Sequence, residues 1–181
     1  MRIGTLLHCT SHLFDTEILV SSFVAPKPLR EFEALKSEAI KAAAHTADAY
    51  IQNWTRYVIA QEEFGRGRMN EARDAALELM QLGRRLDDPR STGLGLSALA
   101  WIALTSESFA EALEYSEQSL AVAIAPWDQN LANCGKGIAL VLLRQTEEGA
   151  KVLEAQRRWC LVDGDLATLT ITDGGLSKKR F

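Results

Sequence analysis

The stretch GLGLSALAWIALTSESFAEALEYSEQSL, from Gly93 to Leu120, is the most informative part of this chain. Its first half is apolar on almost every side, and its second half places apolar residues at the i, i+3, i+4 and i+7 positions of one helix face. A polar run from Thr105 to Ser108 separates the halves, and Ser108 with Glu111 has the S-x-x-E spacing of a capping box. The stretch therefore predicts a hairpin of two helices.

Similar hairpins are predicted on both sides of this one. Pro28, Pro89 and Pro126 mark boundaries between helices, because proline lacks a backbone donor and restricts the residue before it. The expected elements, in chain order, are helices over 29–45, 48–64 and 69–86, the central hairpin beginning at Ser91 or Thr92, and a third hairpin from Asp128 to Leu161.

One small residue recurs near the start of the second helix of each hairpin. Ala72, Ala112 and Ala150 lie 40 and 38 residues apart. An alanine at such a position lets two helices cross closely, since the distance between helix axes depends on the side chains at the contact. Repeats of roughly 34–47 residues stack because one hairpin cannot bury its apolar face alone. A plain helical bundle with coincidental spacing is the alternative.

Composition supports an all-α fold. The chain has 181 residues, of which 47% are hydrophobic and 24% charged, as in ordinary globular proteins. Ala, Leu and Glu dominate where Val, Ile and Thr would dominate a sheet. We expect a poorly specified N-terminal segment over 1–28, one helical repeat domain over 29–176 with about three hairpins and a truncated next helix, and a tail over 177–181.

Charge and cysteine usage limit the partners and the compartment. The net charge of −4 gives no long-range positive field to attract nucleic acid or an anionic membrane, so neither is an expected partner. No segment reaches the ~18 uninterrupted apolar residues of a membrane span. Cys9, Cys134 and Cys160 are odd in number and widely spaced, which predicts free, buried thiols in a reducing compartment. We therefore expect a cytoplasmic protein.

No motif in the sequence predicts catalysis, so we expect neither an enzyme nor a cofactor. His8 and His12 have the i, i+4 spacing of metal ligands, but the glutamate of H-E-x-x-H is missing and no metal site is expected. The phosphate-binding pattern G-x-x-x-x-G-K-[ST] is absent around Gly135-Lys136-Gly137. Glycine inside an apolar helix more often permits close packing.

The second helices resemble helix B of tetratricopeptide repeats (TPR). The resemblance lies in the segments E-A-R, A-E-A-L and E-E-G-A-K, in which Ala72, Ala112 and Ala150 match the small position of that helix. The chain departs from the family pattern four residues later, where an aromatic residue is expected, and in the W-x₂-L-G-x₂-Y signature of helix A. The resemblance implies antiparallel hairpins stacked as a right-handed solenoid.

A narrower resemblance covers residues 29–174. The runs DPRSTGLGLSALAWIAL, FAEALEYSEQSLAVAIAPWDQNLANCGKGIALVLL and EEGAKVLEAQRRWCLVDGDLATLTITDG are similar to the C-terminal TPR-like region of bacterial class III adenylate/guanylate cyclase-type proteins. In that family the repeats are taken to be regulatory or interaction-bearing. The chain has no room for a cyclase domain, so we expect a regulatory fragment of a longer protein.

Two functions remain open at this point. The first is a protein-interaction scaffold whose concave groove, lined mainly by first helices, holds a protein or peptide. Trp54, Arg56 and Tyr57 are its expected partner contacts, since these residue types dominate binding hot spots, although core packing of the aromatics is the alternative. The second is a regulatory domain that senses a small ligand and acts on a cyclase.

The C-terminal hairpin also predicts self-association. Without a capping helix, its apolar face around Leu140, Leu143, Leu153 and Trp159 would be partly exposed. A homo-oligomer formed through this uncapped repeat is therefore an expected assembly.

Overall fold

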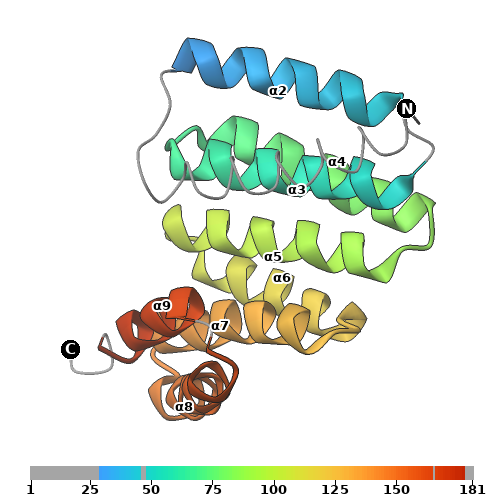
Figure 1. Cartoon of the computed structure of the whole chain (residues 1–181). Helices are drawn as coiled ribbons and strands as arrows, with labels where there is room; N and C mark the ends of the chain where they lie inside the picture. Colours follow the sequence, from blue (N-terminus) through green and yellow to red (C-terminus); the bar gives the residue numbers. More distant parts are fainter. Residues whose placement is uncertain (1–28, 46–47, 165, 178–181) are drawn as a thin grey trace. The chain divides into compact units, whose positions relative to one another are not determined.

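The computed structural model describes residues 29–45, 48–164 and 166–177 (Figure 1). The predicted N-terminal segment with Cys9 and the His8 and His12 pair, and most of the predicted tail, lie outside the described residues. Within the described part, the secondary structure consists of eight α-helices and contains no strand. The prediction of an all-α protein is confirmed. The chain divides into two compact units, Met1–Ala75 and Ala76–Phe181, and each is described by itself.

The described part of the first unit contains two whole helices and the beginning of a third. These are α2 (Leu29–Ala44), α3 (Ala49–Gly65) and the start of α4 (Met69–Arg85). Helix α2 begins directly after Pro28, as predicted. It packs against α3 and buries Phe32, Ala39 and Ala43. All three helices end within one residue of their predicted limits.

The second unit contains the rest of α4 and five further helices. These are α5 (Pro89–Thr105), α6 (Phe109–Val122), α7 (Pro126–Leu142), α8 (Thr146–Asp163) and α9 (Leu166–Ser177). From α5 to α9, each helix packs against the next one in the chain, and α7 also contacts α5 and α9 (Figure 1). The two predicted hairpins are therefore present as α5 with α6 and α7 with α8.

The turns that close these hairpins share one backbone conformation. Gly67, Glu107 and Arg144 follow α3, α5 and α7 and have positive φ angles of 74°, 60° and 68°. After each turn, an N–H bonds back to the carbonyl five residues earlier, as in Ser108 to Ala103 and Gln145 to Leu140, both at 2.9 Å. This Schellman pattern satisfies carbonyls that the helix end would leave without a donor.

The N-terminal caps differ from the predicted ones. Helix α5 begins at Pro89, with Asp88 as its cap, and not at Ser91 or Thr92. The Asp88 carboxylate accepts hydrogen bonds from the Arg90 N–H, at 3.1 Å, and from the Ser91 hydroxyl. Proline suits the first helical position because the N–H it lacks would have no partner there.

Two further predictions about helix starts are wrong. Helix α7 begins at Pro126, two residues before the predicted Asp128. Ser108 occupies the cap position of α6, but its side chain makes no capping hydrogen bond, so the capping box with Glu111 is not formed. The Glu111 carboxylate instead accepts a hydrogen bond from the Tyr115 hydroxyl at 3.1 Å.

Small residues lie at the close helix contacts, as the recurring alanine predicted. Ala72, Ala112 and Ala150 are all buried, and Ala112 packs with Ala103 of α5 and Ala139 of α7. Glycines allow still closer contacts. A Cβ added to Gly95 of α5 would lie 2.7 Å from a backbone nitrogen of α4, and one added to Gly149 of α8 would lie 2.7 Å from a carbonyl of α7.

Helix α9 covers the end of the last hairpin. Leu140 and Leu153 are fully buried, whereas Leu143 and Trp159 are half-buried. The Cα of Gly175 faces Ile138 and Leu153 so closely that a Cβ would lie 2.8 and 3.0 Å from their side chains. The prediction that this face is left uncapped is therefore wrong. The expected homo-oligomer stays a prediction, since Leu143 and Trp159 keep part of their surface exposed.

Polar contacts hold α9 in place beside its apolar packing. The hydroxyl of Thr172 lies 3.3 Å from the sulfur of Cys134, and Arg157 Nε donates to the carboxylate of Asp173 at 2.8 Å. Cys134 and Cys160 are both free and buried, as predicted.

Replacing Gly95 with alanine tests the close contact between α4 and α5. The new Cβ would meet backbone atoms, which cannot move as a flexible side chain can, so we expect a loss of about 1–3 kcal/mol in the free energy of unfolding. Gly174→Ala in α9 is the matched control, because nothing lies within 4 Å of its Cβ position. It should gain about 0.5–1 kcal/mol from helix propensity. Urea unfolding of both variants decides the question, and equal gains would show that Gly95 is not a close contact.

Candidate functional site

The three predicted partner contacts lie on α3 in the first unit. The rings of Trp54 and Tyr57 are 5.3 Å apart with 38° between their planes. Tyr57 is only 7% exposed, whereas Trp54 and Arg56 are half-buried. One guanidinium nitrogen of Arg56 donates to the carbonyl of Gln52 at 3.0 Å. Tyr57 is thus a core residue, and Trp54 and Arg56 keep part of their surface available.

The first unit also contains a network of charges around a buried carboxylate. Glu63 of α3 is 0% exposed and forms ion pairs with Lys36 of α2 and, at 3.0 Å, with Arg68. Arg68 also pairs with Glu33 of α2 and, at 3.2 Å, with Glu71 of α4. Removing a carboxylate from water is costly unless cations and donors compensate it. The network therefore ties α2 to the turn between α3 and α4.

A second cation strengthens the same attachment. Arg66 lies over the ring of Phe32, with 4.2 Å between its guanidinium carbon and the ring centroid. The same guanidinium pairs with Glu62 at 3.3 Å. This network was not among the expected sites, although Glu62-Glu63 followed by Arg66 and Arg68 indicates charge pairing in the sequence.

Two groups of the network have shifted pKa values. The hydrogen bond that Arg68 donates to Glu33 is the main reason that the pKa of Arg68 is raised, and the charges of Glu63 and Glu71 add to it. The pKa of Glu71 is lowered, mainly because its carboxylate accepts a hydrogen bond from its own backbone N–H and next because Arg68 is near. Glu71 lies in the first turn of α4, where the helix dipole favours an anion.

Removing Lys36 should show how much the buried carboxylate depends on its cations. We expect Lys36→Met to lower the free energy of unfolding by about 1–3 kcal/mol, because Glu63 then keeps only Arg68. The matched control is Lys136→Met, which breaks a 2.9 Å pair with the exposed Glu117 and should cost less than about 1 kcal/mol. Equal losses in urea unfolding would contradict a special role for Glu63. Adding Glu63→Gln to Lys36→Met should recover part of the loss.

The Glu71 shift predicts a pH dependence. A carboxyl whose pKa is lowered by folding stabilises the folded state above its unfolded pKa, about 4.3, and loses this contribution as the pH falls through the lower folded value. In Glu71→Gln the stability should therefore fall less steeply below about pH 4.3 than in the original chain. Urea unfolding measured across the acid range checks this, and two parallel pH profiles would refute it.

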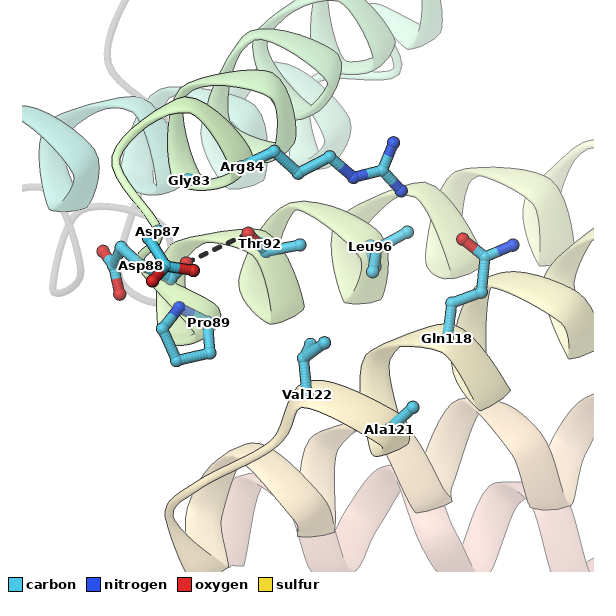
Figure 2. Close-up of a pocket in the computed structure, with 10 residues that line it drawn as sticks. All are labelled: Gly83, Arg84, Asp87, Asp88, Pro89, Thr92, Leu96, Gln118, Ala121 and Val122. Carbon is cyan, nitrogen blue, oxygen red and sulfur yellow. Dashed lines mark hydrogen bonds between the residues drawn. The ribbon is translucent and has the colours of Figure 1, made fainter.

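A groove lies in the second unit beside the turn between α4 and α5 (Figure 2). It has a volume of about 650 Å³ and is formed by the end of α4, the start of α5 and the last turns of α6. Its lining residues are Gly83, Arg84, Asp87, Asp88, Pro89, Thr92, Leu96, Gln118, Ala121 and Val122. Pockets of small ligands usually have volumes of roughly 300–1,000 Å³, so the groove is large enough to bind a ligand.

The groove combines charged groups with an apolar floor. Leu96, which is 1% exposed, and Val122 contribute apolar surface, and Asp87, Asp88 and Arg84 contribute charges. Asp87 has a φ of 52°, in the left-handed region that aspartate adopts more readily than most residues. In the sequence, Pro89 predicted only a boundary between helices at this position.

The polar groups of the groove that face α5 and α6 already have partners. The Thr92 hydroxyl donates to the Asp88 carbonyl at 3.0 Å, as the dashed line in Figure 2 shows. The amide of Gln118 donates to Glu114 at 3.0 Å. The charged groups are therefore the main recognition elements that the groove offers.

The first helix of the central hairpin, α5, is more buried than the lining of an open binding surface would be. In α5, every residue from Ser91 to Ala100 is buried. Packing between neighbours therefore explains the all-round apolar character of this helix, and only its first two turns reach the groove.

The described residues contain no group of three His, Cys, Asp or Glu side chains that could hold a metal ion. None of the helices in that part of the chain combines the length and apolar character that crossing a membrane requires. Comparison with family models, with curated proteins and with solved structures gives no match to this chain.

Proposed function

We propose that this chain is a non-catalytic protein-interaction module built from TPR-like hairpins that stack as a right-handed solenoid. One observation carries the proposal: successive hairpins repeat the same left-handed turn and place small residues at their helix contacts. The first helices α5 and α7 also contact each other, as stacked hairpins require. Stacked repeats build extended surfaces on which other proteins bind.

The resemblance to the repeat region of class III cyclase-type proteins suggests the biological setting. We propose that the module is regulatory and that it acts on an adenylate or guanylate cyclase when a partner protein binds. With a class III cyclase encoded beside this reading frame, the purified chain should change the rate of cyclic nucleotide formation. An unchanged rate at saturating chain concentration, or the lack of any such neighbouring gene, contradicts this setting.

A small-ligand sensor is the second candidate. The groove beside Asp87 favours it, because its size suits a small ligand and charges of both signs line it. The scaffold remains our first proposal, because it also accounts for the repeated hairpins. Trp54 and Arg56 supply a further surface for a protein partner, with Tyr57 supporting Trp54 from the core.

Selection from a library of random dodecapeptides displayed on phage tests the interaction function. A peptide-binding module should enrich related sequences whose synthetic forms bind with micromolar Kd values in fluorescence polarisation. The control is the same chain unfolded in urea. It should lose all binding, because the peptides must be selected by a folded surface and not by nonspecific association with an unfolded segment. If the folded chain enriches nothing, the proposed function is wrong.

A further inference from the structure

We propose that residues 9–25 dock as a helix on the face of α2 that carries Leu29 and Ile40. This segment is then the first helix of one more hairpin, with α2 as the second helix, and it caps the first unit. Such a cap goes beyond the interaction function proposed above, since it concerns how the chain covers its own end.

The spacing of the helices assigns α2 to a hairpin. Helices α2, α4 and α6 begin at Leu29, Met69 and Phe109, at intervals of 40 residues. In the described hairpins, the first helices begin at residues 49, 89 and 126 and the second helices at residues 69, 109 and 146, an offset of 20 in each case. Each of these first helices has 17 residues. The same offset and length place the first helix of the α2 hairpin at residues 9–25.

Two apolar positions of α2 are exposed that are covered in the other second helices. These positions recur every 40 residues in α2, α4 and α6, and they hold Leu29, Met69 and Phe109 at one and Ile40, Met80 and Leu120 at the other. Leu29 and Ile40 are 54% and 46% exposed, whereas Met80 is 8% exposed and the other three are half-buried. In the described part of the chain, α4 and α6 each follow a first helix. A first helix beside α2 would cover Leu29 and Ile40 in the same way.

The sequence of residues 9–25, which lie outside the described part of the structure, suits this role. Seven of its 17 residues are large and apolar, namely Leu13, Phe14, Ile18, Leu19, Val20, Phe23 and Val24. They would lie on most sides of a helix, as the apolar residues of α5 do. Docking such a helix on Leu29 and Ile40 removes apolar surface of both partners from water.

The short connection favours this segment over a second copy or another protein. Only residues 26–28 separate the segment from Leu29, so bringing the two together costs little loop-closure entropy. A segment joined to its surface in this way also has a higher effective concentration than a separate molecule has.

Pro28 should make this hairpin weaker than the others. In the turns after α3, α5 and α7, the N–H of the third residue bonds to the carbonyl five residues earlier, as Ser108 bonds to Ala103. Pro28 takes the third place before α2 and has no N–H to donate. The segment is therefore held mainly by side chains, and it should open more often than α5 does.

Hydrogen–deuterium exchange of the full chain, followed by mass spectrometry, tests the proposal. The amides of residues 13–24 should exchange about tenfold more slowly than in a synthetic peptide of the same sequence, and faster than those of α5. In the double variant Leu29→Gln, Ile40→Gln they should exchange at the rate of the peptide. Slow exchange of α2 itself in this variant would show that α2 still folds.

The matched control is Ile124→Gln, Leu161→Gln. It also replaces one exposed isoleucine and one exposed leucine, which are 66% and 55% exposed, but it does so in the second unit. Exchange of residues 13–24 should stay slow in this control.

Three outcomes would overturn the proposal. The first is exchange of residues 13–24 at the rate of the peptide in the original chain. The second is slow exchange that persists in Leu29→Gln, Ile40→Gln, which would mean that the segment packs elsewhere. The third is protection that disappears on dilution as a dimer dissociates in sedimentation, which would assign the surface to a second copy. None of them depends on peptide selection, so this proposal and the interaction function can fail separately.

Discussion

The second unit depends on helices that approach each other at residues without large side chains. Gly95 faces the backbone of α4, Gly149 faces the backbone of α7, and Ala112 lies between Ala103 and Ala139. At these contacts the distance between helix axes is set by backbone atoms, so the hairpins have little freedom to shift. The wider apolar core then forms around fixed contacts, and its larger residues, such as Leu99 and Leu153, are completely buried.

The first unit is held together by different chemistry. Its helix α2 buries Phe32 and two alanines, and the ion pairs of Glu63 and Arg68 add to this attachment, together with the contact of Arg66 with the Phe32 ring. Charge pairs at the surface respond to salt and pH, whereas buried apolar contacts respond weakly. The stability of the first unit should therefore depend more strongly on salt and pH than that of the second unit, although both are built from helices of similar length.

Helix positions could be predicted from the sequence because they follow from local periodicity and from prolines. The recurring alanines were found in the same way. The caps could not be predicted so well, because Asp88 and Ser91 are both good capping residues and only the start at Pro89 decides between them. Left-handed turns at Glu107 and Arg144 lack the glycine that signals them. The covering of Leu153 by α9 and the meeting of Asp87 with Val122 at one groove depend on packing between distant segments, which no local pattern reveals.

The burial of α5 changes where recognition should be sought. A helix whose residues 91–100 are all covered by neighbours leaves little surface for a partner along its middle, whatever its place in the order of helices. Exposed polar groups then concentrate where hairpins are joined, because the turns must present their backbone and side chains to water. The turn at Asp87 has a further property. It follows α4, to which the backbone N–H groups of Asp87 and Asp88 bond, and it caps α5 through the Asp88 carboxylate, so its backbone is held by helix ends on both sides. A charged site in this position is more rigid than an ordinary loop. A rigid site loses less conformational entropy when it binds a partner.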